Sequence, residues 1–307
     1  MKRAHRLRLF FLATVFALFE WSTRAPPSLP PPPPHAERPA PSPSPSPSDP
    51  ELAGLYVFYR NPAAFLQTLR SYRAAYPAAS LHLFADAGAH DFGAAARHFN
   101  ATFDGAARRI TAKKKGSTYF GRQNADVILG VVRDALAGMA EPFFILLEDD
   151  VVVHRRVRSP LLHDIQGCAW DHKTITGYPE EFVRRRGGGG DKPLPLTGFG
   201  GSVFRARALR RAASPTAEEL DELFLHAEDG TLGTDYLFGS LVAASNGTLG
   251  CFDGFVEAGW ERARAEQLAR EGRLEVAHGE KGAYGRALSA EDLAVLGPGW
   301  ERTLEAG

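Results

Sequence analysis

The chain has 307 residues and carries 36 basic and 36 acidic side chains. This balance produces no overall field that would attract nucleic acid or an anionic surface, so we expect no nucleic-acid partner. Hydrophobic residues form 44% of the sequence, which is enough for a substantial core.

The first 24 residues have the layout of a targeting segment. Basic side chains at positions 2, 3, 6 and 8 precede an apolar run at residues 9–19, and Glu20 ends that run. This order is typical of a secretory signal, and the run has about half the length of a membrane span. A cleaved signal peptide and a short signal anchor both fit the pattern. No small-x-small cleavage site follows Phe19, which favours the anchor.

Residues 25–50 form a tract rich in proline and serine, with five consecutive prolines at 30–34 and alternating Pro-Ser at 41–48. Such a composition cannot bury a core and favours an extended, stiff chain. We therefore expect a disordered stalk at 25–50 and one globular domain at 51–307. This build indicates a single-pass type II membrane protein of the Golgi or the ER with a lumenal domain, or a secreted protein if the signal is cleaved.

Two cysteines and two tripeptides bear on this placement only weakly. Cys168 and Cys251 fit either one disulfide or two buried thiols, and their spacing does not indicate a metal site. The tripeptides that begin at Asn100 and Asn246 match the N-x-[ST] pattern of a glycoprotein. Because such tripeptides arise often by chance, they add little weight by themselves.

The first part of the globular domain alternates between strands and helices. Apolar runs predict strands at 55–59, 81–85, 101–103 and 143–147. Apolar periodicity predicts helices after Asn61, after Asp91 and across 124–139. The order β-α-β-α-β-α-β indicates an α/β fold, with a Rossmann-type mixed sheet that is largely parallel and has helices on both faces.

The second part is less regular. Short strands are predicted at 172–175 and 203–205, and helices are expected to begin at Thr216, Asp235, Arg262 and Ser289. The segment 178–196, which contains three consecutive arginines and four consecutive glycines, is expected to be a mobile loop. No repeat and no second linker occurs after residue 50, so one domain with two subregions is predicted.

The strand predicted at 143–147 runs directly into three acids, Glu148, Asp149 and Asp150, which three valines follow. Carboxylates at the end of a buried strand are unfavourable unless a positive group lies there. In open α/β sheets this position is where ligands bind, and carboxylate oxygens are ligands that Mg²⁺ or Mn²⁺ accepts. The alternative is a solvated turn between two strands.

The segment LEDDVVV resembles the D-x-D or E-D-D element of GT-A fold nucleotide-sugar glycosyltransferases, Golgi N-acetylglucosaminyltransferase I among them. Three further segments resemble elements of that group in the same chain order, at residues 198–202, 234–237 and 277–281. The acidic motif is moderately specific, and the other three are weak individually. The resemblance covers roughly residues 52–285 and assigns no subfamily.

The resemblance implies a metal-dependent glycosyltransferase that moves a sugar from a nucleotide-diphosphate donor, expected to be a UDP-sugar, to a hydroxyl of a glycan or glycoprotein. Mn²⁺ or Mg²⁺ would neutralise the leaving diphosphate. Asp150 is the first candidate ligand, Asp149 would contact the metal or the ribose, and Glu148 the ribose or a neighbouring group. His278 would add an imidazole ligand or is a surface histidine. Lys281 would meet a phosphate or is solvated.

Asp235 is the candidate general base of an inverting transfer, which needs a carboxylate to remove the proton of the acceptor hydroxyl. The chain departs from the group here, because Thr234 stands where the group has Glu. Glu228 and Asp229 supply a literal Glu-Asp pair upstream, so Asp229 is the alternative. Asp235 would otherwise be an N-cap residue, and an N-terminal position would lower its pKa.

Donor contacts are expected from five residues: Gly200, Gly201, Arg122, Asn124 and Arg60. The two glycines allow close approach of backbone, or they form an ordinary turn. Arg122 and Asn124 open the helix before the acidic strand, and Arg60 follows the first strand. The first strand–helix turn lacks G-x-G-x-x-G, which disfavours a dinucleotide-binding enzyme.

Two other functions fit the same residues. Thr234 in place of Glu suggests a catalytically inactive nucleotide- or glycan-binding protein on the same fold. A metal-dependent phosphotransferase or nucleotidyltransferase is a third hypothesis. All three share the expectation that the acids after residue 147 bind a divalent cation.

Overall fold

A computed structural model of the chain describes residues 50–58, 61–86, 90–108, 120–167, 175, 178–188, 193–198, 200–225, 227, 230–259 and 261–301. The predicted targeting segment at 1–24 and the tract at 25–49 lie outside these residues, as do Arg60, Cys168 and Asp229. The described residues belong to one compact unit, which spans Ser46–Gly307. None of the helices described has the length and apolar character that a membrane crossing requires.

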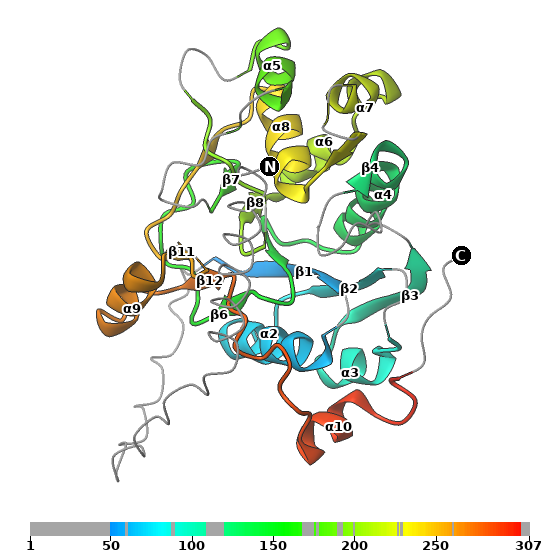
Figure 1. Ribbon diagram of the computed structural model, residues 1–307, viewed down its shortest axis with the longest axis vertical. Helices are drawn as coiled ribbons and strands as arrows, with labels where there is room; N and C mark the ends of the chain where they lie inside the picture. The colour runs from blue at the N-terminus through cyan, green and yellow to red at the C-terminus, as the bar shows by residue number, and fades with distance from the viewer. Residues whose placement is uncertain are drawn as a thin grey trace, which may run out of the picture. The chain divides into compact units, whose positions relative to one another are not determined.

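A seven-stranded sheet forms the centre of this unit, in the order β10-β7-β8-β5-β1-β2-β3 (Figure 1). Its strands are β1 (Leu52–Phe58), β2 (Leu81–Asp86), β3 (Thr102–Arg108), β5 (Phe143–Leu147), β7 (Ile165–Gln166), β8 (Val203–Arg205) and β10 (Leu249–Gly250). Neighbouring strands are parallel except at β8, which runs antiparallel to both β5 and β7. The sheet is therefore mixed, and all its strands except β8 point the same way.

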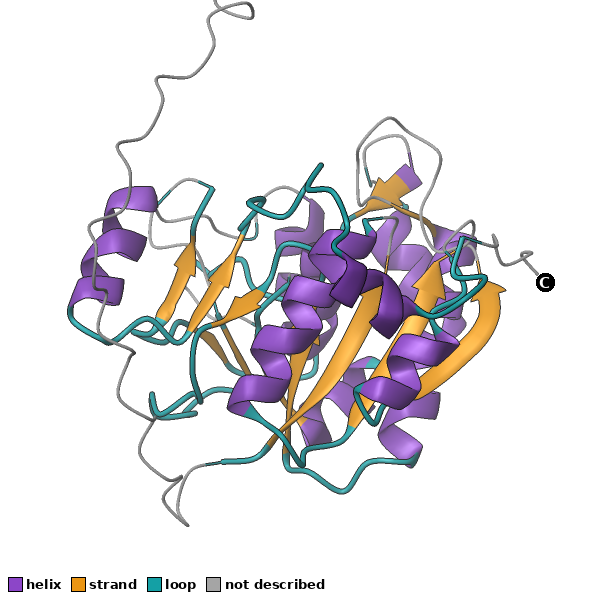
Figure 2. Cartoon of the chain, turned by 90° about the horizontal axis from the view of Figure 1, so that it is seen from below, coloured by secondary structure: helices purple, strands orange, loops and turns teal. Residues whose placement is uncertain are grey.

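Helices cover both faces of the sheet (Figures 1 and 2). One face carries α2 (Pro62–Ala75), α3 (Gly93–His98) and α10 (Ala290–Leu296), and the other carries α4 (Arg122–Ala137), α6 (Ala206–Ala212), α7 (Ala217–Phe224) and α8 (Thr234–Ala244). Alternation along β5 supplies both cores, since Ile145 and Leu147 enter the first and Phe144 and Leu146 the second. The predicted α/β fold, with a mixed sheet between helices, is confirmed.

Two smaller sheets lie beside the large one. β11 (Phe255–Glu257), β12 (Val276–His278) and β6 (Val152–Val153) form a three-stranded sheet, and β4 (Phe120–Gly121) pairs with β9 (Thr231–Leu232). β6 follows the acids of β5 after one residue, and β12 pairs antiparallel with β6, Ala277 opposite Val152. The three-stranded sheet thus carries His278 to the acidic turn.

The prediction of a mobile loop at 178–196 is wrong over its first half, where α5 (Tyr178–Arg185) forms. Phe182 and Val183 are buried in the same core as α8. Burial of these two side chains stabilises the helix, although most of the segment is charged or glycine. Arg186 then bonds to Glu219 and Glu222 of α7, at 2.9 and 2.7 Å. Long-range packing, rather than local propensity, fixes this segment.

Three further predictions concern a helix cap, a short strand and the cysteines. The capping box of Thr216 and Glu219 is present at the start of α7. Of the strand predicted at 172–175, only Ile175 is described. Cys251 is disulfide-bonded. Helix α9 (Arg262–Arg270) packs against β11 of the three-stranded sheet.

Candidate functional site

The acidic turn, residues 148–151, is held in place by α2. The Thr68 hydroxyl of α2 lies 2.8 Å from the carbonyl oxygen of Val151 and 3.1 Å from that of Glu148. The Val151 N–H donates to the Glu148 carbonyl at 3.1 Å, which closes the turn. Thr68 is fully buried, so no water competes for these hydrogen bonds. The turn is therefore rigidly placed at the carboxyl end of the central strand.

Three side chains converge at this turn: Glu148, Asp150 and His278. One ligand atom of each lies within 4.8 Å of the others, and we call this set the acid–histidine group. The Nε2 of His278 lies 3.6 Å from Glu148 Oε2 and 3.4 Å from Asp150 Oδ1. Two carboxylates and an imidazole are a donor set that fits a divalent transition ion such as Mn²⁺ better than Mg²⁺, which prefers oxygen alone.

Asp149 lies outside this group, although it was a predicted metal ligand. Its Oδ1 accepts a hydrogen bond of 2.5 Å from the buried hydroxyl of Tyr56, which lies in β1. Within the turn, the Glu148 and Asp150 carboxylates face the group, while the Asp149 carboxylate faces Tyr56 of β1. Burial, together with the charge of Asp149, holds the pKa of Tyr56 well above its usual range. Glu148 occupies the position in the group that was predicted for Asp149.

A fourth carboxylate, that of Glu257, orients the histidine. The Nδ1 of His278 lies 2.6 Å from Glu257 Oε2, and β11 pairs with β12 so that these two residues are in register. Glu257 is itself buried, and its backbone N–H donates to Glu261. Since Glu257 accepts the Nδ1–H, Nε2 faces the two acids of the turn, which is the arrangement of a metal-binding histidine with a supporting carboxylate.

The electrostatics of the group favour a cation. Burial alone would lower the pKa of the His278 imidazole, but the carboxylates of Glu148, Glu257 and Asp150 outweigh it and raise the pKa to about 10. A proton on His278 thus balances part of the negative charge. A metal ion would take the place of that proton, since a ligating histidine must be neutral.

A glycine turn lies against the same group. A Cβ at Gly200 would come within 2.9 Å of the His278 ring and 3.1 Å of Glu148 Oε2, and Gly201 has a positive φ of 84°. The Gly201 N–H donates to the Leu146 carbonyl at 2.7 Å, which fixes the turn to β5. The ordinary-turn alternative explains the positive φ, but not the lack of room for a side chain at Gly200 beside two members of the group.

Asp235 lies in the first turn of α8, and the N-cap of that helix is Gly233, with no capping side chain. The alternative that Asp235 is itself the cap is therefore wrong. Burial, to which the charge of Glu148 adds, raises its pKa to about 6 despite opposing backbone hydrogen bonds. Its carbonyl oxygen would lie 3.3 Å from a Cβ at Gly198, so the start of α8 packs closely against the glycine turn. The charges of Glu148 and His278 both act on the Asp235 carboxyl.

Two of the predicted donor contacts, Arg122 and Asn124, lie at the start of α4. Arg122 donates to Asp126 at 2.6 Å and to Asp221 of α7 at 2.7 Å, so its guanidinium is engaged by two carboxylates. Asn124 is half-buried beside Gly121. Arg60 and the alternative base Asp229 are outside the described ranges.

The loop after β12 places Tyr284 near the site, a residue that the sequence analysis did not single out. The Glu280 N–H donates to the Asp150 carbonyl at 2.9 Å, which ties the loop to the turn, while Lys281 is exposed. Tyr284 is 42% exposed, and partial burial with the nearby charges of Asp149 and Asp150 raises its pKa. Tyr284 therefore borders the site. Its only sequence signal was an aromatic residue among glycines.

Comparisons with known proteins give little more. No family model matches the chain, and no curated protein is significantly similar to it. The fold is similar to that of the galactosyltransferase LgtC in complex with donor and acceptor sugar analogues, with 12% identity and a TM-score of 0.44 over 78% of this chain and 98% of that one. An active-site mutant of LgtC gives 14% identity and a TM-score of 0.44, over 73% and 86%. A likeness at this level assigns no activity, which depends on the site itself.

Proposed function

We propose that this chain is a metal-dependent glycosyltransferase, which moves a sugar from a nucleotide-diphosphate donor, expected to be a UDP-sugar, to a hydroxyl of a glycan or glycoprotein. The observation that carries the proposal is the acid–histidine group at the carboxyl end of β5, with a carboxyl of raised pKa, Asp235, behind the adjoining glycine turn. A cation can neutralise a leaving diphosphate, and a proton acceptor can activate the hydroxyl that attacks.

Glu148, Asp150 and the Nε2 of His278 would hold the cation, with Mn²⁺ preferred because the donor set includes an imidazole nitrogen. The bound ion would neutralise the charge that develops on the leaving diphosphate. Glu257 keeps Nε2 directed at the two carboxylates. Gly200 lets the backbone pack directly against the group, because a side chain there would clash with His278 and Glu148.

Asp235 would serve as general base. With a pKa of about 6, its carboxyl is ionised at neutral pH and is a stronger base than an ordinary aspartate. It would accept the proton of the acceptor hydroxyl while the hydroxyl oxygen attacks the anomeric carbon and the diphosphate leaves. Attack opposite to the leaving group gives inversion, and the anomeric configuration of the product, measured by proton NMR, tests this step.

The test uses the purified full chain with Mn²⁺ and a panel of nucleotide sugars, with and without a chelator. We expect release of nucleoside diphosphate from at least one donor and its loss in chelator. If no nucleotide sugar is turned over under any of these conditions, the proposal is wrong.

A non-catalytic nucleotide- or glycan-binding protein is the second candidate, favoured by Thr234 before Asp235. It predicts that UDP with Mn²⁺ raises the melting temperature while no product forms. Ligand at 100 times its Kd adds about 2.7 kcal/mol of stability, which a melting series resolves. The lumenal, membrane-anchored placement expected from residues 1–50 is likewise a proposal.

A further inference from the structure

Two asparagines occupy the same local structure at separate places in the fold. Asn100 follows α3 and Asn246 follows α8, and both have positive φ, at 49° and 57°. Among the described residues other than glycine, they alone have this conformation. After each, the next N–H bonds back five residues, from Ala101 to Ala96 and from Gly247 to Val242. Both helices thus end in the Schellman motif with asparagine at the left-handed position.

Helix capping explains asparagine at these positions but not the threonine two residues after each. Of the four asparagines in the chain, these two begin an N-x-T tripeptide, and the other two, Asn61 and Asn124, do not. Asn100 and Asn246 are both exposed. Neither amide group has a hydrogen-bond partner among the described residues. Each tip is therefore open to a covalent substituent without loss of a contact.

The sheet topology places both tripeptides on one edge. Thr102 begins β3, and Thr248 directly precedes β10. Because β3, β5, β7 and β10 point the same way, the starts of β3 and β10 lie at the amino edge of the sheet, and the acids after β5 lie at the carboxyl edge. Bulky groups at Asn100 and Asn246 would thus stand opposite the acid–histidine group.

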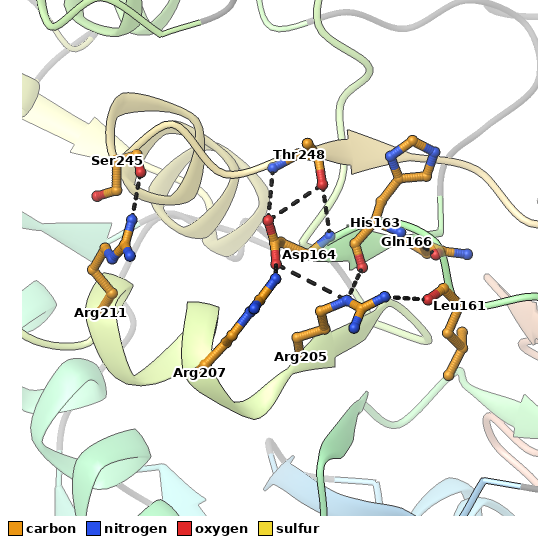
Figure 3. Close-up of polar contacts among 9 residues, drawn as sticks. All are labelled: Leu161, His163, Asp164, Gln166, Arg205, Arg207, Arg211, Ser245 and Thr248. Carbon is orange, nitrogen blue, oxygen red and sulfur yellow. Dashed lines mark hydrogen bonds and ion pairs between the residues drawn. The ribbon is translucent and has the colours of Figure 1, made fainter.

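The two tripeptides differ in how far the fold engages their threonine. Figure 3 shows Asp164 beside Thr248, with the Asp164 N–H donating to Thr248 Oγ1 at 3.1 Å and the Thr248 N–H donating to Asp164 Oδ2 at 3.0 Å. Arg207 lies 3.6 Å from the same aspartate. Thr102, by contrast, is exposed on β3. The acceptor pattern requires the threonine hydroxyl. We therefore expect Asn246 to be modified before the chain folds and Thr248 bonds to Asp164.

We propose that Asn100 and Asn246 are N-glycosylation sites, whose glycans cover the amino edge of the sheet and leave the carboxyl edge open. The donor class is an oligosaccharide on a lipid diphosphate, transferred by the enzyme of the secretory pathway. A bond forms from the side-chain amide nitrogen to the anomeric carbon, the bond from that carbon to the lipid diphosphate breaks, and the nitrogen loses one proton. The proposal does not depend on the transferase activity of this chain.

The full chain is expressed in a eukaryotic secretory cell and analysed by gel mobility and peptide mass spectrometry, before and after treatment with peptide-N-glycosidase. We expect two steps of mobility shift, and conversion of asparagine to aspartate at both positions in the treated protein. Asn100→Gly and Asn246→Gly should each remove one step. Glycine keeps the left-handed conformation of the helix end, so these variants test the substituent rather than the fold.

Thr248 provides the matched control. Thr248→Ser keeps the acceptor hydroxyl and should keep the glycan at Asn246, whereas Thr248→Val should remove it with Asn246 unchanged. Absence of any glycosidase-sensitive shift in the full chain overturns the proposal, as does persistence of both steps in the double glycine variant. A large change in UDP and Mn²⁺ binding after native deglycosylation would contradict the placement of the glycans opposite the site.

Discussion

The two parts of the domain reach the candidate site in different ways. The first part supplies Glu148 and Asp150 at the end of β5, a five-residue strand inside a parallel sheet. The second part supplies Glu257 from β11 and His278 from β12, strands of three residues that pair with one another, and β12 also pairs with β6. The acids thus follow directly from a strand of the large sheet, while the histidine is brought to them by the pairing of a small sheet, whose Phe255 and Val276 pack in the same core as Ile145 and Leu147.

Removal of an acid from the first part should have the largest effect. Asp150→Ala deletes one of the two carboxylates of the acid–histidine group. If this group holds the cation as proposed, the cation contributes several kcal/mol to the transition state, so we expect loss of turnover by about 1,000-fold or more. Nucleoside diphosphate release by the full chain measures it. Asp253→Ala, at an exposed acid of a turn, is the control and should retain activity. Equal activity in the two variants would contradict a metal role for Asp150.

Asp235 tests the base. Because its carboxyl acts when ionised, kcat/KM should fall tenfold for each pH unit below about 6 and level off above it. Asp235→Asn should lower kcat by about 100-fold or more at neutral pH. Its raised pKa also means that the folded state disfavours the charged carboxyl, so this contribution destabilises the fold increasingly as pH rises from the unfolded value toward about 6.

The same variant therefore has an opposite effect on stability. Asp235→Asn should raise the melting temperature at pH 7, because the neutral amide avoids the burial of charge that the aspartate undergoes. Loss of activity together with loss of stability would indicate a structural role for Asp235 and contradict its assignment as base.

Glu257 tests the contribution of the second part. Glu257→Gln weakens the hydrogen bond that directs Nε2 of His278, and substitution of such supporting groups reduces metal affinity by about 10–100-fold. Calorimetric titration with Mn²⁺ measures this without any turnover. Glu271→Gln, on the exposed end of α9, is the matched control. If Mn²⁺ affinity is unchanged, the small sheet acts as scaffold only, and the comparison between the two parts fails.

Gly200 tests the junction of the two parts and should show the smallest effect. Gly200→Ala places a Cβ against His278 and Glu148, at a cost in stability of about 1–3 kcal/mol and with weaker Mn²⁺ binding. Gly282→Ala is the control, since a Cβ there meets nothing within 4 Å. Denaturant unfolding and Mn²⁺ titration measure the two effects. If the Mn²⁺ affinity of Gly200→Ala is unchanged, the glycine turn is not part of the metal site.

The sequence predicted the first part of the fold well because its signals are local. Apolar runs of about five residues predict its strands, and apolar residues at helical spacing predict the helices between them. The second part depends on pairs of two- or three-residue strands, such as β12 with β6, whose register is set by contacts more than a hundred residues apart. No local pattern encodes such pairing.

The candidate site divides in the same way. The sequence named Glu148, Asp150 and His278, which the structure brings together, but which of Glu148 and Asp149 joins the group depends on the direction of each side chain after the strand ends. Tyr56 decides it, because its buried hydroxyl takes Asp149 out of the group. Glu257 was missed, since a carboxylate in a short strand has no signal until its register with His278 is known.

The most direct test of the central claim is the effect of Mn²⁺ on the affinity of the full chain for UDP, measured by calorimetry. If Glu148, Asp150 and His278 bind a cation that contacts the diphosphate, Mn²⁺ should tighten UDP binding by about tenfold or more, and UDP should tighten Mn²⁺ binding by the same factor. Equal UDP affinity with and without Mn²⁺ would contradict the account.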